Sequence, residues 1–525
     1  MATPSNPGSA SLWRPLRSPT FRNLLLADVV SDIGTFMQSV GAAWLMVSLH
    51  AGPMYVALTQ TASALPFFLL ALPAGAIGDI VDRRKVILFT ETWMVGVAVV
   101  LAAMTIAGKM SPVLLLILTF ALSAGDAFET PTWRAVLPEL VPKEDLPAAS
   151  ALNGIEFNFA RAVGPALAGF LIAIAGIGAA FVVNTVSFLG VLLVVARWKR
   201  PVVKRATPPE TVSGATVAAI RYVRYSPAVR AILLRAGTAM FFASGLLALL
   251  PSVANRISDS PVGYGVLLGC FGCGAVLGAL VMQRARARWS ADIVVAAGIA
   301  TFGLTTIAAG SVHALTPLAA VMLLGGAAWI SFISLFNVQV LNQTPDWVRA
   351  RVLAVSMLVF QGGIAAGSAT WGAVAARVGL GQALLWAGIG TILSTVLGLF
   401  LRLPDVSIDL TPWNHWRLPA VVAADADAGG PVLVTVEYHV DPERAPEFIK
   451  TMREYGRVRR RDGASRWGIC RDLEVADRYL ETFIVSSWAE HLRQHDRLTR
   501  ADSQLEERLR RCVHSEPKVR HLLYL

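Results

Sequence analysis

The feature that most constrains this chain is a series of long apolar segments, each bounded by Gly, Pro or charged residues. A helix can cross a bilayer with about 20 apolar residues, and the segments have that length. They predict twelve spans, at about 21–49, 54–78, 86–107, 112–133, 148–174, 178–196, 229–251, 262–283, 291–311, 315–340, 351–375 and 380–401. A break at 197–228 divides these spans six and six.

The composition agrees with a chain that lies mostly in lipid. Hydrophobic side chains make up 55% of the 525 residues and charged ones only 15%, whereas soluble proteins carry about 25% charged residues. This excludes one large soluble enzyme and any disordered chain, and four cysteines are too few for a disulfide-stapled fold. The net charge of +11 could suggest nucleic acid, but membrane topology accounts for it better. We expect no nucleic-acid partner.

Basic residues are concentrated on one side of the predicted membrane. That side receives 24 Lys and Arg side chains from the termini and alternate loops, and the other side has only Lys109, Arg256 and Arg377. Because positively charged loops stay in the cytoplasm, we expect both termini and the central loop there, in a protein of the cytoplasmic (inner) cell membrane. More or fewer spans would break this alternation.

We therefore expect an all-α membrane protein that ends in a small soluble α+β domain. Residues 431–525 hold 16 of the 35 acidic residues, and this change in composition marks the soluble domain. The predicted parts are an N-terminal six-helix half (1–196), a central loop (197–228), a C-terminal six-helix half (229–402), a linker (403–430) and the α+β domain (431–525).

The C-terminal domain shows the order βαββαβ. The patterns predict strands over 432–440, 466–471, 479–486 and 519–524, a helix over 442–461 and one charged helix over 489–512. This is the ferredoxin-like pattern. It resembles the small dimeric α+β barrel domains of the antibiotic-biosynthesis monooxygenase type.

The loop after the second predicted span carries a motif, Gly75-Ala-Ile-Gly-Asp79-Ile-Val-Asp82-Arg83-Arg84-Lys85. Glycine lets helices approach closely, a carboxylate can meet a helix N-terminus, and basic side chains can lie against lipid phosphates. The stretch resembles the Gly-x-x-x-Asp signature of the major facilitator superfamily, with Ile80 in place of a basic residue and Asp82 in place of a glycine. The resemblance implies a cytoplasmic conformational latch formed by Gly75, Asp79, Asp82, Arg83, Arg84 and Lys85.

Further stretches resemble one drug–proton antiporter branch of that superfamily, which includes exporters of enterobactin and of macrolides. One stretch runs from Ala127 to Asn153, and a matching loop from Thr344 to Arg351 precedes the eleventh span. Another, Gly164-Pro165-Ala-Leu-Ala-Gly169, is similar to the Gly-Pro motif that accompanies export. Over residues 15–405 the resemblance implies export of a small molecule coupled to proton entry.

Ionisable side chains inside the predicted spans are the candidates for that coupling, because each costs at least about 2.5–3.5 kcal/mol near the bilayer centre. Asp28 and Asp32 lie four residues apart on one helical face, where desolvation and mutual repulsion favour protonation of one of them. Asp32 is the leading candidate, since Asp28 could instead be solvated at the cytoplasmic mouth. The other candidates for the proton path or substrate cavity are Glu129, Glu156, Arg161 and Gln38.

Several of these polar side chains also have a purely structural interpretation. Arg161 could pair with a neighbouring acid, and Glu91 could pair with Arg84 or Arg134. Gln38 could make an ordinary hydrogen bond between helices.

No motif in the sequence requires a metal or a cofactor. Cys270 and Cys273 lie in a glycine-rich span without a second ligand pair. His491 and His495, with His439, could hold a metal, but solvated helix histidines are the interpretation that we favour.

The sequence thus predicts a transporter with a small amphipathic substrate, such as a drug, a siderophore or a secondary metabolite. Its expected partners are that substrate, protons, the lipid bilayer and, through the C-terminal domain, a second copy of the chain. Import by the same fold is one alternative. Another is a bifunctional protein whose C-terminal domain is an enzyme acting on the substrate. No ATP-binding loop motif is present, which disfavours an ATP-driven pump.

Overall fold

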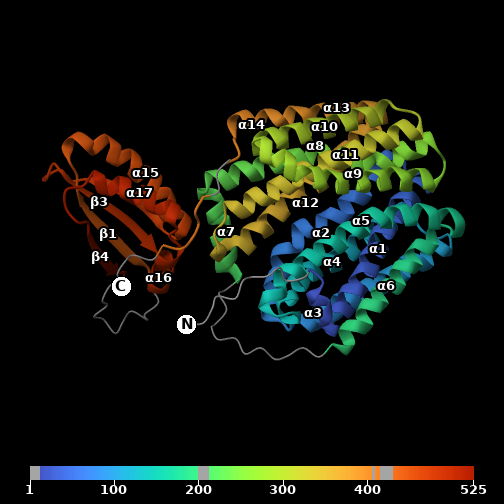
Figure 1. The fold of residues 1–525 in the computed structure, drawn as a ribbon, viewed down its shortest axis with the longest axis horizontal. Coiled ribbons are helices and arrows are strands. Elements are labelled where there is room, and N and C mark those ends of the chain that lie inside the picture. The colour runs from blue at the N-terminus through green and yellow to red at the C-terminus, as the bar shows by residue number, and fades with distance from the viewer. Residues whose placement is uncertain (1–11, 199–211, 405–407, 414–429, 525) are drawn as a thin grey trace, which may run out of the picture. The chain divides into compact units, whose positions relative to one another are not determined.

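The computed structural model describes residues 12–198, 212–404, 408–413 and 430–524, with side chains except at 71–72, 75–80, 212–215, 283 and 496 (Figure 1). The chain divides into two compact units. The first contains residues 1–209, 234–335 and 357–402, and the second contains 210–233, 336–356 and 403–525. Much of the predicted central loop and of the predicted linker lies outside the described residues.

Long helices occur at all twelve predicted spans. Eleven helices of the described part are long and apolar enough to cross a membrane. The first predicted span is a 30-residue helix that is not among the eleven, and polar residues such as Asp28, Asp32 and Gln38 interrupt its apolar sequence. The helices are α1 (Pro19–Ser48), α2 (Gly52–Ile80), α3 (Arg83–Ile106), α4 (Pro112–Leu140), α5 (Leu146–Ala175), α6 (Ile177–Arg197), α8 (Pro227–Ile257), α9 (Pro261–Arg288), α10 (Ala291–Ser311), α11 (Leu315–Asn342), α12 (Asp346–Val378) and α13 (Leu380–Leu393), which continues through a 3-10 turn into α14 (Leu397–Phe400).

The sequence marks several helix starts with a serine followed by a proline. The Ser18 and Ser111 side chains accept hydrogen bonds from backbone N–H groups of α1 and α4, and Ser260 does so for α9. A serine cap satisfies an otherwise free N–H group, and proline fits the first turn because it lacks one. These signals set the helix boundaries.

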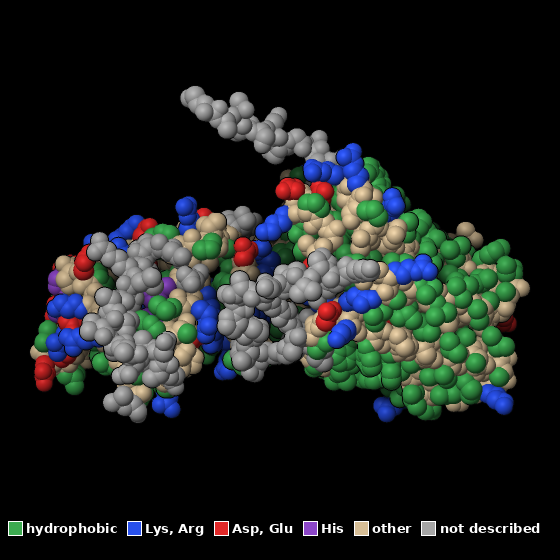
Figure 2. Space-filling model, turned by 90° about the horizontal axis from the view of Figure 1, so that it is seen from below, with side chains coloured by type: hydrophobic (Ala, Val, Ile, Leu, Met, Phe, Trp, Pro, Cys, Tyr) green, Lys and Arg blue, Asp and Glu red, His purple; other side chains and the backbone are tan. Residues whose placement is uncertain are grey.

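Inside the first unit, α1 packs against both α5 and α6, and α3 packs against α4 and α6. The α2 helix packs on α4, α5 on α9, and α10 on α13. Figure 2 shows that apolar side chains cover much of the helical surface, and large ones such as Phe170 and Leu280 are more than half exposed. A surface of this kind is stable against lipid tails rather than water. The chain is therefore a multi-pass membrane protein.

The C-terminal domain has the predicted strands in the predicted order, with one more helix than predicted. It contains β1 (Val432–His439), α15 (Ala445–Asp462), β2 (Ser465–Arg471), β3 (Arg478–Val485), α16 (Trp488–Arg497), α17 (Arg500–Arg511) and β4 (Lys518–Leu523). The strands form one antiparallel sheet in the order β2-β3-β1-β4. Alternate β1 residues, including Val434 and Val436, are buried against Phe448 and Met452 of α15. The α+β ferredoxin-like prediction is confirmed.

The prediction of one helix over 489–512 was wrong. Two helices occupy that stretch, and they are separated at Leu498–Thr499. The Thr499 side chain and Asp502 form a reciprocal capping box, in which Asp502 accepts hydrogen bonds from the Thr499 N–H, at 3.0 Å, and from its hydroxyl, at 2.7 Å. This arrangement starts a new helix.

The central loop also contains a helix that the sequence did not indicate, α7 (Val212–Tyr225). It belongs to the second unit, where it packs against α15. Its side chains Ala218, Ala219 and Tyr222 are buried. Short apolar patches of this kind stabilise a helix only when a partner covers them, and the partner is not evident from the sequence of the loop.

Candidate functional site

Six carboxyl groups from four helices gather inside the first unit. Asp28 and Asp32 come from α1, and Glu156 comes from α5. Helices α3 and α4 contribute Glu91, Asp126 and Glu129. All six positions lie inside the predicted spans. The packing of α1 and α3 against their neighbours brings the groups together.

Four of the six carboxyl groups form two pairs. The Asp32 carboxyl hydrogen-bonds that of Glu156, and the Glu91 carboxyl hydrogen-bonds that of Glu129. A carboxyl group can donate a hydrogen bond only when it is protonated, so each pair requires at least one proton. A pair of this kind can release and regain its proton as its access to water changes.

Burial supports the same protonated arrangement. Glu91 is 2% exposed and Glu156 is 6% exposed. One oxygen of each, Oε2 of Glu91 and Oε1 of Glu156, is buried without a hydrogen-bond partner among the described residues. An ionised carboxylate so placed would lose its hydration without compensation.

Neutral donors contact the two remaining carboxyl groups, Asp28 and Asp126, and also Glu129. The Trp133 indole N–H donates to Asp28 Oδ2 at 3.1 Å. The Thr130 hydroxyl donates to Asp126 at 3.0 Å, and the Thr90 hydroxyl donates to Glu129 at 2.9 Å. These contacts fix the orientation of the acids without neutralising them.

Positive charge reaches the cluster from two arginines. Arg161 attracts Asp32 electrostatically, and its guanidinium carbon lies 4.7 Å from the ring centroid of Phe157 on its own helix. Arg134 attracts Asp126. Two positive charges against six acids leave an excess of carboxyl groups, so the cluster is more than a set of structural ion pairs.

Gln38 makes a different contact. The Asn184 amide of α6 donates to its side-chain oxygen, and Gln38 is buried at 8% exposure. This is the helix-to-helix hydrogen bond that the sequence left open as an alternative. The hydrogen bond joins α1 to α6, a helix that carries none of the paired acids.

The latch residues lie at the junction of α2 and α3. Asp82 caps α3 by accepting a hydrogen bond from the Arg84 N–H at 2.9 Å. Arg83 forms an ion pair with Glu139 of α4 at 2.6 Å. Arg84 donates a hydrogen bond to the Ala196 carbonyl at the end of α6 at 2.6 Å. Lys85 is exposed. Gly75 and Asp79 lie in α2, but their side chains are outside the described residues.

The arginines of this motif therefore join α3 to α4 and α6 directly. The sequence suggested lipid phosphates as their partners, whereas in the structure both arginines donate hydrogen bonds to protein groups. A guanidinium is suited to this role because it donates several hydrogen bonds in fixed directions.

The Gly-Pro motif sets the packing of α5 on both sides. A Cβ at Gly164 would lie 2.7 Å from the Cβ of Phe36 on α1. A Cβ at Gly169 would lie 3.0 Å from the Cα of Gly265 on α9. Pro165 is buried between these two positions in α5, and its carbonyl oxygen faces Gly265. The motif thus allows α5 to approach α1 and α9 closely.

Contacts inside the second unit connect the C-terminal domain with α7 and with the first turn of α12, and they connect α7 with the loop between α11 and α12. The Tyr222 hydroxyl donates to the Gln343 carbonyl at 2.7 Å. Arg221 of α7 reaches Glu490 Oε1 of α16 at 3.2 Å. Arg497, which is buried, bonds the same Glu490 oxygen at 2.6 Å and lies over the Trp347 ring at 4.5 Å.

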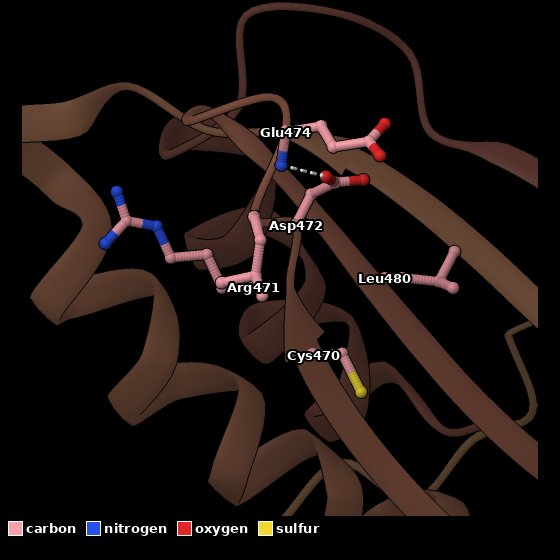
Figure 3. Close-up of a pocket in the computed structure, with 6 residues that line it drawn as sticks. Cys470, Arg471, Asp472, Glu474 and Leu480 are labelled. Carbon is pink, nitrogen blue, oxygen red and sulfur yellow. Dashed lines mark hydrogen bonds between the residues drawn. The ribbon is translucent and has the colours of Figure 1, made fainter.

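A shallow hollow of about 420 Å³ lies at the turn between β2 and β3 (Figure 3). Its lining includes Cys470 and Leu480. The Asp472 carboxylate there accepts hydrogen bonds from the Glu474 N–H at 2.7 Å and from Arg478 at 2.6 Å. The Asp472 carboxylate is thus occupied in holding the turn.

Sequence reasoning found the acids of α1, Glu129 and Glu156. It gave Glu91 less weight and did not select Asp126, Thr90 or Trp133 as candidates. The sequence feature that points to Glu91 is its position inside a predicted span, where a carboxyl group is costly. Its partner, Glu129, is 38 positions away in the chain, and a single sequence does not show which helices meet.

A family profile described as "Transmembrane secretion effector" matches residues 10–525. The staphyloferrin A transporter of Staphylococcus aureus is 23% identical over 73% of this chain and 96% of its own. The multidrug efflux pump Tap of Mycolicibacterium fortuitum is 25% identical over 74% of this chain and 97% of its own. The enterobactin exporter EntS of Escherichia coli is 24% identical over 78% of this chain and 96% of its own.

Solved structures show the same fold. A bacterial homologue of the lysosomal transporter Spinster, in an inward-facing and occupied conformation, superposes with a TM-score of 0.59 at 14% identity, covering 74% of this chain and 97% of its own. A POT family transporter in complex with 5-aminolevulinic acid gives a TM-score of 0.60 at 12% identity, covering 73% and 96%. The relatives and the structures leave roughly a quarter of this chain unmatched.

Proposed function

We infer that this chain, which belongs to the transmembrane secretion effector family of major facilitator transporters, exports a small amphipathic molecule in exchange for protons. Two features support export. The relatives include proteins named as an exporter and an efflux pump, and the Gly-Pro motif lies in α5 at its contacts with α1 and α9. The substrate class that we propose is a drug, a siderophore or a secondary metabolite.

The observation that carries the proton coupling is the carboxyl pair of Asp32 and Glu156. The two side chains come from α1 and α5, which pack together. When the pair faces the proton-rich side it holds its proton. When the helices rearrange and expose it to the cytoplasm, it releases the proton, and Arg161 stabilises the ionised Asp32.

The second pair, Glu91 with Glu129, extends the path toward α3 and α4. Asp28 lies close enough to Asp32 and Glu129 for mutual repulsion. Loss of a proton from one pair therefore alters the proton affinity of the groups beside it. We propose that the cluster transfers protons stepwise along these acids.

The latch residues control the change of access in this proposal. The Arg83–Glu139 ion pair and the Arg84 hydrogen bond to the end of α6 hold three helices together. We place Asp79 and Gly75 in the same latch because of the motif. While the latch closes one side of the membrane, the substrate can leave only on the other side, and its opening restores access from the first side. This is alternating access in a major facilitator fold.

We place both termini and the C-terminal domain in the cytoplasm of a cell-membrane protein, because the basic loops lie on that side. The C-terminal domain then acts on the transporter as a regulatory module. Its contacts with α7 and with Trp347 join it to segments that continue into α8 and α12. We favour this role over an enzymatic one, which no described residue of the domain specifically supports.

The domain also offers a surface for a second copy of the chain. On the sheet face opposite α15, Leu480 and Leu522 are exposed, and Glu437 lies opposite Lys518 on the neighbouring strand. A face with apolar residues beside both signs of charge can pair with itself. Native mass spectrometry should show a dimer that Leu522→Asp dissociates, and a wild-type monomer would contradict this part of the proposal.

The experiment that tests the transport function measures accumulation of a fluorescent dye and a macrolide panel in drug-sensitive cells that express the chain. We expect lower accumulation than in cells without the chain, and an uncoupler should restore it. Higher accumulation of the same compounds would establish import instead. If accumulation falls but is insensitive to the uncoupler, proton coupling is contradicted.

A further inference from the structure

Three side chains that could ligate a metal converge at one end of the C-terminal sheet. His439 ends β1, Asp477 precedes β3, and His514 follows α17. Their ligand atoms all lie within 4.8 Å of one another. His439 Nδ1 is 3.0 Å from Asp477 Oδ2, and His514 Nε2 is 3.4 Å from the same oxygen.

These spacings match the edges of a tetrahedral metal site. A zinc ion bound at 2.0–2.1 Å by nitrogen and oxygen places neighbouring ligand atoms about 3.3–3.4 Å apart. The distances from Asp477 Oδ2 to His439 Nδ1 and to His514 Nε2 are 3.0 and 3.4 Å. They lie within a few tenths of an ångström of the ideal edge. The His514 side chain is 47% exposed, so a small rotation can adjust its distance from His439.

Each histidine has a carboxylate beside its second ring nitrogen. His439 Nε2 is 3.3 Å from Glu437 Oε1, and His514 Nδ1 is 3.6 Å from Asp441 Oδ1. Histidines that bind metals usually donate their other N–H group to a carboxylate or carbonyl, which fixes the tautomer. In the tautomers with protons on His439 Nε2 and His514 Nδ1, the lone pairs of His439 Nδ1 and His514 Nε2 face Asp477.

The backbone holds the three ligand segments together independently of any ion. The His514 N–H donates to the His439 carbonyl at 3.1 Å, and the Val440 N–H donates to the Asp477 carbonyl at 2.8 Å. The Asp441 N–H donates to the Cys512 carbonyl at 3.1 Å. A site with preset ligand positions loses less entropy when it binds an ion.

We propose that His439 Nδ1, Asp477 Oδ2 and His514 Nε2 bind one divalent transition-metal ion of the zinc type, with water in the fourth position. Two imidazoles and one carboxylate suit zinc better than calcium or magnesium, which prefer oxygen ligands alone. The bound ion links the end of β1 to the segments before β3 and β4. All three ligands belong to the C-terminal domain, and the presence of the site does not depend on what the transporter exports.

The test uses the full chain in detergent, purified with a tag that contains no histidine and stripped with a chelator. Zinc alone is the probe, and it is titrated in competition with a chromophoric chelator. We expect one zinc ion per chain. His514→Gln should lower the affinity at least 100-fold, and Glu437→Gln should lower it about tenfold because it leaves the ligands in place but removes a partner of His439.

Two control variants remove histidines that lie outside the site. His521→Gln changes a histidine of the same domain, and His313→Gln changes an exposed one near α11. Both should bind zinc as the wild type does. Cobalt, used as a second probe, should give the strong visible absorption of a four-coordinate ion in the wild type and in both controls.

Three outcomes would overturn the proposal. One is wild-type protein that binds no zinc in the micromolar range. Another is unchanged binding in both His514→Gln and Asp477→Asn. The third is loss of binding in His521→Gln alone, which would assign the ion to other histidines. If His514→Gln fails to fold, Glu437→Gln decides, because a tenfold weaker affinity supports the site and an unchanged affinity contradicts it.

Discussion

At the residue scale, the carboxyl cluster shows what a sequence reveals about a membrane site and what it does not. The cost of charge in lipid identifies Asp28, Asp32 and Glu156 as unusual wherever their helices pack. Their pairing depends on contacts between α1 and α5, and no spacing within one helix specifies those contacts. The sequence thus predicts the members of the cluster better than their partners.

For the histidines of the C-terminal domain, too, the sequence did not predict which side chains would be in contact. His491 was expected to be solvated, and this was wrong, because it is 4% exposed. Its Nε2 lies 3.0 Å from that of His521 on β4 and 3.2 Å from that of His495. His439 does not join them and instead contacts Asp477. The break between α16 and α17, which the periodicity did not reveal, lies directly after this cluster.

We predict that this histidine cluster makes the C-terminal domain less stable in acid. Burial, together with His495 and His521, lowers the pKa of His491 to about 3, whereas an unfolded histidine has a pKa of about 6.5. Between these values the unfolded state binds a proton that the folded state does not, so the free energy of unfolding falls as the pH decreases. The loss is at most about 1.4 kcal/mol per pH unit.

Hydrogen exchange of the 488–523 segment, corrected for intrinsic rates, measures this effect in the full chain. Protection should decrease from pH 7.5 to pH 5.5 in the wild type and in the exposed-histidine control His313→Gln. His491→Gln should show a clearly weaker dependence. Equal pH dependence in all three proteins would mean that other groups are responsible.

At the element scale, the helices followed from the sequence with little ambiguity, because long apolar runs bounded by serine, proline and charge have few alternatives. The span with the weakest apolar signal, α1, carries Asp28, Asp32 and Gln38. The same polar residues that weaken the apolar signal of α1 make it a candidate for the proton path. The α7 helix lacks such a signal, since its burial comes from α15, more than 200 residues later.

We predict that Gly169→Val abolishes transport while the protein still inserts. The backbone of α9 is 3.0–3.1 Å from the position of a Cβ at Gly169, so a branched side chain forces α5 and α9 apart. Uncoupler-sensitive efflux, normalised to the amount in the membrane, should fall at least tenfold. Gly154→Val on the same helix is the control, because no atom of a neighbouring helix lies within 4 Å of its Cβ position among the described residues. If Gly169→Val and Gly154→Val were equally active, transport would not depend on the close packing of α5 at the Gly-Pro motif.

At the scale of the whole molecule, the family profile reaches residue 525, whereas the relatives named above leave roughly a quarter of the chain unmatched. The change in composition at residue 431 predicts a separate C-terminal domain. The sequence does not predict how this domain attaches to α7 and to Trp347 at the start of α12, because the attachment depends on tertiary contacts of Arg221 and Arg497.

We predict that Arg497→Gln loosens this attachment. Arg497 is 5% exposed and donates to Glu490 and to the Asp462 carbonyl, both at 2.6 Å. Removing a buried charge partner typically costs roughly 3–5 kcal/mol. Hydrogen exchange in 216–225 and 343–349 should accelerate at least tenfold. Arg493→Gln is the control, since Arg493 contacts the same glutamate from the surface, with its side chain 48% exposed. If exchange in both segments is unchanged in a folded Arg497→Gln protein, the attachment does not depend on this arginine.

The central claim, that the acid pair of Asp32 and Glu156 couples protons to export, is tested most directly in proteoliposomes. The substrate is a compound that the accumulation panel has identified. Two processes are measured for wild type, Asp32→Asn and Glu156→Gln: uphill transport driven by a pH gradient, and exchange of labelled for unlabelled substrate without a gradient. We predict that both variants keep exchange and lose uphill transport. Gradient-driven transport at the wild-type rate in both variants would contradict the account.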